Sequence, residues 1–161
     1  IVRSLVGSEM CIRDRNIPKS VLRKTADKAI WRKPKEYLEH LDRLPLAANM
    51  APFLPHSMLR IEVMGLQDSI SRQPTKAELQ QMVGILEEAM DDGYLGLSTD
   101  GLPLHFLANA PNTAKRIPTQ YAKYEEYKLL TDVLRGRDRV WQMTPATDDG
   151  GLTVRLSLIH I

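Results

Sequence analysis

Residues 75–98 read TKAELQQMVGILEEAMDDGYLGLS, and this segment indicates the fold class most clearly. Thr75 and Glu78 have the spacing of a capping box, in which each side chain satisfies a free backbone N–H at the start of a helix. The apolar side chains that follow recur at three- and four-residue steps: Leu79, Met82, Val83, Leu86 and Met90. Gly93 suits a left-handed helix cap, and the glycine inside Tyr94–Ser98 indicates close packing of a short strand. The segment therefore predicts a helix over 75–92 and a strand over 94–98.

Other segments repeat this alternation of helix and strand. Pro34 suits the first position of a helix, and apolar residues at helical spacing follow it up to Pro45. Strands are predicted at 46–54, 94–98 and 139–143, and helices at 56–64, 75–92 and 118–135. Strands that alternate with helices are typical of parallel βαβ units, so the fold class is α/β. Because a (β/α)8 barrel takes about 250 residues, about three such units make up only a section of one.

Composition excludes several classes of protein. The chain has 161 residues, of which 43% are apolar and 26% charged, and its net charge is +2. These values are ordinary for a globular protein and argue against global disorder. No apolar run approaches the roughly 18 residues of a membrane span, and the balanced charge gives no electrostatic footprint for nucleic acid. We expect neither a membrane nor a nucleic-acid partner.

The two ends differ in character from the rest of the chain. Ile1–Arg15 has neither the cleavage site of a signal peptide nor a clear periodicity, and it resembles translated sequencing-adapter DNA, as does Leu156–Ile161. We therefore expect non-native tails over 1–15 and 156–161, and one partial domain over 16–155. Cys11, the single cysteine, falls in the first tail, so we expect no disulfide framework and no thiol nucleophile.

Four stretches resemble the N-acyl-D-amino-acid deacylase (D-aminoacylase) branch of the amidohydrolase superfamily. They are Trp31–Leu44, which contains Pro-Lys-Glu-Tyr-Leu; Asn49–Arg60 followed by Val63-Met64-Gly65; Arg72–Leu79 with the helix to Gly93; and Gly96-Leu-Ser-Thr99. The family has Gly-His-Gly-x-Leu-Arg, Val-Met-Gly and Gly-Leu-Ser-Thr-Gly at the second and fourth of these places. The four stretches occur in the family's order over most of residues 16–155.

This resemblance implies a metal-dependent hydrolase on a (β/α)8 barrel. Such enzymes use Zn²⁺ to cleave the amide C–N bond of N-acyl-D-amino acids, which are non-peptide linear amides, so the implied partner is a small-molecule substrate. The family's ligands are a His-x-His, a cysteine, two later histidines and a late aspartate. This sequence has no His-x-His, and Val140–Pro145 lacks the histidine that the family places at the end of that strand. We expect the whole protein to be the enzyme, and this fragment to be inactive and to bind no zinc by itself.

Candidate site residues follow the three predicted strands, because barrel active sites lie at the carboxyl ends of the strands. His56 follows the first strand, Ser98, Thr99 and Asp100 end the second, and Gln142 lies in the third with Thr144 after it. These side chains are predicted to bind substrate or to support a metal ligand. Ordinary roles are the alternative: His56 as the cap of a helix, and Ser98–Asp100 as turn formers.

One further histidine lies in the long loop 99–117. His105 and Asp100, five residues apart, are candidates for a proton-transfer group or for metal ligands, although zinc takes three or four ligands. Arg60 is expected to pair with Glu62 or Asp68 rather than to clamp a substrate carboxylate.

Two rival hypotheses remain open. The missing histidine in 140–144 favours a non-catalytic barrel relative that has lost its metal. The third hypothesis is an unrelated small α/β binding module whose motifs match by chance. The absence of cysteine from residues 16–155 is compatible with a cytoplasmic protein.

Overall fold

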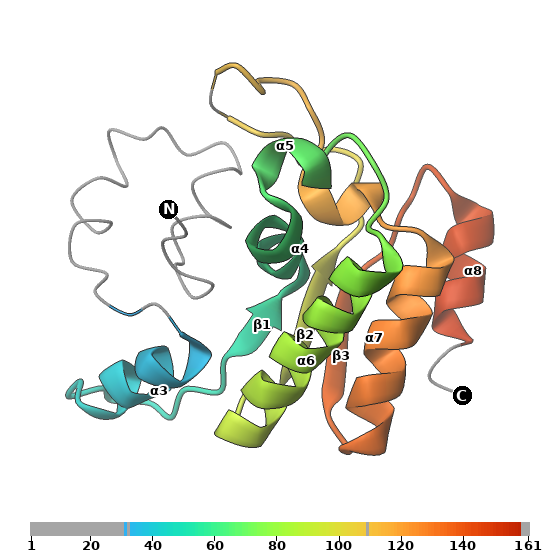
Figure 1. Cartoon of the computed structure of the whole chain (residues 1–161). Helices are drawn as coiled ribbons and strands as arrows, with labels where there is room; N and C mark the ends of the chain where they lie inside the picture. Colours follow the sequence, from blue (N-terminus) through green and yellow to red (C-terminus); the bar gives the residue numbers. More distant parts are fainter. Residues whose placement is uncertain (1–30, 32, 109, 159–161) are drawn as a thin grey trace.

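A parallel three-stranded sheet organises the protein (Figure 1). The computed structural model describes residues 31, 33–108 and 110–158. The strands are β1 (Phe53–Pro55), β2 (Gly96–Asp100) and β3 (Val140–Thr144), and β2 lies between the other two. The α/β class and the parallel pairing that the sequence predicts are confirmed.

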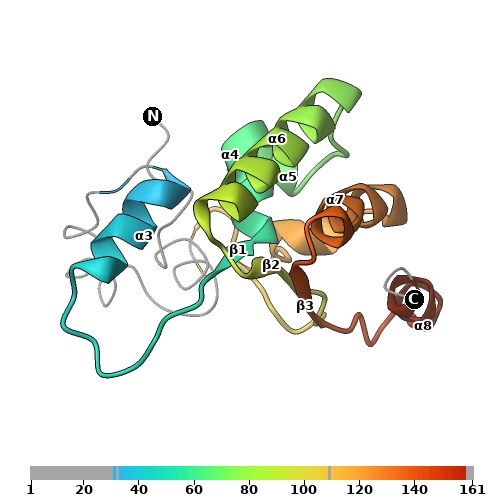
Figure 2. The same cartoon turned by 90° about the horizontal axis from the view of Figure 1, so that it is seen from below.

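Helices cover one face of this sheet. The helices are α3 (Pro34–Asp42), α4 (His56–Met64), α5 (Leu66–Ser69), α6 (Lys76–Asp92), the 3-10 helix η1 (Pro118–Tyr121), α7 (Tyr124–Gly136) and α8 (Gly150–Ser157). Figure 2 shows α4, α6 and α7 on the same side of the strands. Within the described residues, no helix covers the opposite face, which we call the open face.

The main core lies between the sheet and these helices. Buried side chains come from the strands (Leu54, Leu97), from α6 (Met82, Leu86, Ala89, Met90) and from α7 (Leu130, Leu134). Side chains alternate between the two faces of a strand. Because Leu97 points into the core, Gly96, Ser98 and Asp100 are directed to the open face, and Thr99 is directed to the helices.

The helix of residues 75–92 forms as the sequence predicts. Thr75 Oγ1 accepts from the Glu78 amide at 3.2 Å, and the Thr75 amide donates to Glu78 Oε2 at 2.7 Å, which completes the capping box. Gly93 ends the helix at a φ of 117°, a backbone conformation that favours glycine. The predicted close packing at Gly96 is also confirmed, because a Cβ there would lie 1.7 Å from the carbonyl oxygen of Val140.

Three predictions about local structure need correction. The first strand is much shorter than 46–54, because Leu46 and Met50 are 46% and 57% exposed and Pro52 has no N–H to donate to a ladder. The helix predicted at 118–135 is split into η1 and α7 by Ala122, whose backbone is extended.

The third correction is helix α8, which is not among the helices predicted from the sequence. The Asp149 side chain starts it by accepting from the Leu152 amide at 2.8 Å. The expected tail at 156–161 begins inside this helix, and Leu156 is buried against Ala122 and Tyr127. The expected tail at 1–15 lies outside the described residues. No helix in the described part is long and apolar enough to cross a membrane.

Candidate active site at the carboxyl ends of the strands

Asp100 and His105 meet where β2 and β3 end. The Asp100 side chain is only 6% exposed, and its Oδ2 is hydrogen-bonded to His105 Nδ1. The other oxygen, Oδ1, accepts from the Thr144 hydroxyl at 2.7 Å and from the Leu102 amide at 3.1 Å. A buried carboxylate needs such donors to remain charged. The structure therefore brings together two of the residues singled out in the sequence, with Thr144 as their link to β3.

The loop that carries His105 is fixed along its backbone. Gln120 Nε2 donates to the carbonyl oxygens of Leu102 at 2.6 Å and His105 at 3.2 Å. Phe106 and Arg116 form an antiparallel bridge across the loop, and Arg116 also pairs with Asp148 at 2.7 Å. His105 is thus held through its backbone carbonyl and through Nδ1 of its ring, while its side chain stays 30% exposed.

The other strand residues divide between the two faces of the sheet. Ser98 lies in register with Pro55 on one side and with Gln142 on the other, and Gln142 is exposed on the open face. Thr99 is buried on the helix side, where its hydroxyl accepts from Trp141 Nε1 at 2.9 Å. Ser98 and Gln142 therefore share a face with Asp100, whereas Thr99 does not.

His56 belongs to a separate, fully buried cluster. Its Nε2 lies 2.7 Å from Glu126 Oε1, and its Nδ1 lies 2.7 Å from the Thr119 hydroxyl. The Tyr127 ring packs edge-on against the imidazole at 5.4 Å, and the Tyr127 hydroxyl donates to the Thr119 carbonyl at 2.7 Å. His56 joins α4 to α7 and η1 with no exposed surface.

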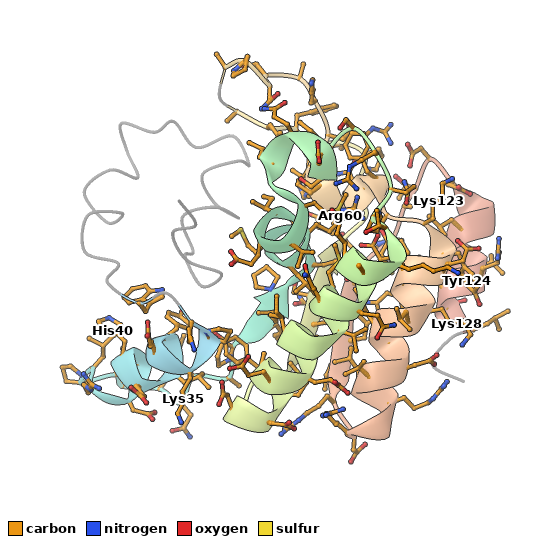
Figure 3. The ribbon with its side chains drawn as sticks, viewed as in Figure 1. Lys35, His40, Arg60, Lys123, Tyr124 and Lys128 are labelled. Atoms are coloured by element: carbon orange, nitrogen blue, oxygen red, sulfur yellow. The ribbon has the colours of Figure 1, made fainter. Side chains whose placement is uncertain are left out.

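Arg60 completes this cluster, which we call the Arg60–Glu126–His56 cluster. The guanidinium has no exposed surface and bonds to Glu126 Oε2, and it also donates to the carbonyl oxygen of Ser69 at 3.2 Å. The expected pairing with Glu62 or Asp68 is wrong, because Arg60 points inward, whereas Asp68 pairs with Arg72 on the surface. Figure 3 shows Arg60 inside the molecule, whereas Lys128 of α7 and Lys123, the residue before α7, project at its surface.

The Glu126 carboxyl stays charged inside the protein. Burial acts to raise its pKa, but the hydrogen bond and charge of His56 and the charge of Arg60 outweigh burial and hold the pKa below its ordinary value. Burial also raises the pKa of the neighbouring Tyr127 hydroxyl. The sequence did not point to Glu126, which lies 70 residues from His56. The signal that could have indicated burial of Glu126 is its position next to Tyr127, on the apolar side of the predicted helix.

The described residues do not fit a zinc site. Zinc in proteins takes three or four nitrogen, sulfur or carboxylate ligands. Among the described residues, no group of three or more histidine, cysteine, aspartate or glutamate side chains is placed to hold a metal. Asp100 and His105 make a pair rather than a set, and His56 is engaged with Glu126.

Curated relatives match a large part of the chain. An uncharacterized protein of Mycobacterium tuberculosis is 36% identical over 131 residues, which are 80% of this chain and 21% of the relative. The N-acyl-D-aspartate deacylase of Alcaligenes xylosoxydans xylosoxydans is 37% identical over 65 residues, which are 40% of this chain and 12% of the enzyme. The chain thus spans about a fifth or less of the length of these relatives. No family model matches it.

Solved structures of N-acyl-D-amino-acid deacylases share this fold. The N-acyl-D-glutamate deacylase of Bordetella bronchiseptica, solved with zinc and a phosphonate inhibitor, aligns with a TM-score of 0.60 at 25% identity. That alignment covers 80% of this chain and 24% of the deacylase. A D-aminoacylase described as defining a subset of amidohydrolases aligns with a TM-score of 0.59 over 79% of this chain and 23% of its own. The chain has the fold of a section of these hydrolases.

Proposed function

We propose that this chain is a section, about three βα units long, of a (β/α)8 barrel amidohydrolase that cleaves N-acyl-D-amino acids. The observation that carries the proposal is that the helices of the described residues lie on one face of the sheet, together with the alignment over 80% of the chain with N-acyl-D-glutamate deacylase. Parallel sheets occur almost only with both faces covered, or closed into barrels with the helices outside.

The residues of the open face support closure into a barrel better than a second layer of helices. The polar residues on this face are Ser98, Asp100, Gln142 and Thr144. Its apolar residues are Val140 in β3 and Phe53 and Pro55 in β1. A layer of helices would need an apolar face to pack on. The interior of a barrel accommodates such side chains, and its carboxyl end carries the active site. We therefore place Asp100, His105, Ser98 and Gln142 on the substrate side. Ser98, His105 and Gln142 are proposed to contact polar groups of the substrate, whereas both oxygens of Asp100 are engaged within the protein.

The metal of such an enzyme needs ligands other than those described here. The related Bordetella deacylase was solved with zinc, whereas residues 31, 33–108 and 110–158 contain no group of three or more histidine, cysteine, aspartate or glutamate side chains that could hold a metal. We infer that zinc, if the whole protein uses it, is bound by residues outside these ranges. We also propose that the chain, as only a section of the barrel, is inactive by itself.

The test compares this chain with the protein translated from its complete reading frame. Each is incubated with Zn²⁺ and N-acetyl-D-amino acids, including the D-aspartate and D-glutamate derivatives, and released acetate is measured. We expect hydrolysis by the complete protein and none by the chain. Turnover by the chain alone would refute the fragment proposal, and no turnover by a zinc-loaded complete protein would refute the activity.

The lack of a histidine in β3 favours one alternative, a barrel that binds a ligand without a metal. Val140–Thr144 supplies a hydroxyl at its carboxyl end, which donates to Asp100. Metal analysis of the purified complete protein separates the two functions. Stoichiometric zinc supports the hydrolase, and a metal-free protein that still binds N-acyl-D-amino acids supports the alternative.

A further inference from the structure

The imidazole of His105 has one nitrogen engaged and one available. Nδ1 bonds to Asp100, and the side chain is 30% exposed. Within the described residues, Nε2 makes no hydrogen bond. An imidazole that donates Nδ1–H to a carboxylate has its lone pair on Nε2, where it can accept a proton.

The donors around Asp100 determine which tautomer His105 adopts. Oδ1 already accepts from two donors, the Thr144 hydroxyl and the Leu102 amide. Oδ2 is the oxygen that faces Nδ1. A carboxylate oxygen can only accept, so the nitrogen it contacts must carry the proton. The arrangement therefore fixes the neutral imidazole as the Nδ1–H form, with Nε2 unprotonated.

The pair is also held in place before any ligand binds. Asp100 is anchored to β3 through Thr144, and the backbone of His105 is bonded to Gln120 and to the Ile117 amide. A fixed group loses little freedom when it reacts, which favours proton transfer.

We propose that Asp100 and His105 form a proton-transfer site, in which His105 Nε2 is the base and Asp100 is its positioning residue. This inference rests on the proposed amide hydrolysis. As a water oxygen attacks the amide carbonyl carbon, Nε2 takes a proton from that water. When the C–N bond breaks, the imidazolium returns the proton to the departing nitrogen. Asp100 remains ionised throughout and stabilises the imidazolium at Nδ1.

The test determines the tautomer of His105 in the chain itself, without substrate or metal. Chain labelled with ¹⁵N-histidine is examined by long-range ¹H–¹⁵N correlation NMR at a pH where the imidazoles are neutral. We expect His105 to show protonated Nδ1 and unprotonated Nε2. A signal from protonated Nε2 would overturn the proposal, because that nitrogen could not accept a proton.

Asp100→Asn reverses the geometry in a defined way. The amide oxygen remains with the Thr144 and Leu102 donors, so the NH₂ group faces Nδ1 and forces the proton onto Nε2. The tautomer should switch, and acylation of His105 by diethylpyrocarbonate should fall about threefold or more as Nε2 loses its lone pair. Asp148→Asn is the matched control, because it releases the Arg116 tie of the same loop without touching the pair.

Each result has one interpretation. Wild-type His105 that is acylated no faster than the buried His56, or a tautomer and rate that Asp100→Asn leaves unchanged, would refute the site. If Asp100→Asn fails to fold, the tautomer of the wild-type chain decides alone. None of these measurements uses deacylase activity, so failure of this site and failure of the proposed function are distinguishable.

Discussion

Glu126→Gln should destabilise the protein strongly. The carboxylate is 2% exposed and is shared by Arg60 and His56, both with no exposed surface. In the variant, the Arg60 guanidinium has only neutral acceptors, which are the glutamine oxygen and the carbonyl oxygens of Ser69 at 3.2 Å and Arg72 at 3.4 Å. These dipoles do not replace a full negative charge, so a buried cation is left without its counter-charge.

The expected cost follows from the burial of both partners. Removal of one member of a buried ion pair costs about 3–5 kcal/mol. Because the glutamine oxygen and the two carbonyl groups retain some hydrogen bonds, we expect a loss near the lower value, about 3 kcal/mol. A domain of this size is stable by about 5–15 kcal/mol, so the change removes a large share of the total.

Urea unfolding of the full chain, followed by circular dichroism at pH 7, measures this loss. Glu125→Gln is the matched control, since Glu125 is an exposed neighbour on the same helix and should change stability by no more than about 0.5 kcal/mol. The double variant Arg60→Met/Glu126→Leu should be less destabilised than Glu126→Gln, because it leaves no unpaired charge. Equal transition midpoints for Glu126→Gln and Glu125→Gln would refute this account of the cluster.

Three further predictions concern stability. The pKa of Glu126 is lowered in the folded state, so its carboxylate stabilises the fold above the unfolded pKa of about 4.3. This stabilisation is lost as the pH falls through the folded pKa. Below about pH 4.5, the unfolding free energy of Glu126→Gln should therefore fall less steeply than that of the wild type. Gly96→Ala should prevent pairing of β2 with β3, because its Cβ would lie 1.7 Å from a backbone oxygen. Gly84→Ala in α6 meets no atom within 4 Å and should raise the unfolding free energy by about 0.5–1 kcal/mol. Equal effects of the two variants on thermal unfolding would contradict this prediction. Thr75→Ala should cost about 1 kcal/mol through loss of the α6 cap, with Thr113→Ala, at an exposed loop position, as the neutral control in the same measurement.

Local signals in the sequence predicted most of the fold. The capping box at Thr75, the apolar stripe of α6 and the glycine cap at Gly93 act within a few residues, so periodicity and capping preferences are enough to find them. The strand at 46–54 failed because an apolar run between prolines does not reveal whether a neighbouring strand can reach it. Only Phe53–Pro55 lies beside β2.

The candidate site was predictable only where its members are close in the sequence. Asp100 and His105 are five residues apart at the end of a strand, and the structure joins them. The link from Asp100 to Thr144 spans 44 residues and that from Arg60 to Glu126 spans 66, so both depend on how strands and helices meet. Spacing along one sequence does not carry that information.

Sequencing of the locus with long, adapter-free reads tests the central proposal most directly. If the chain is a section of an amidohydrolase barrel, the reading frame should continue past both ends. It should encode a His-x-His upstream, and histidines and an aspartate downstream. A natural start near Ile1 and a natural stop near Ile161 would contradict the proposal, because three βα units cannot close a barrel.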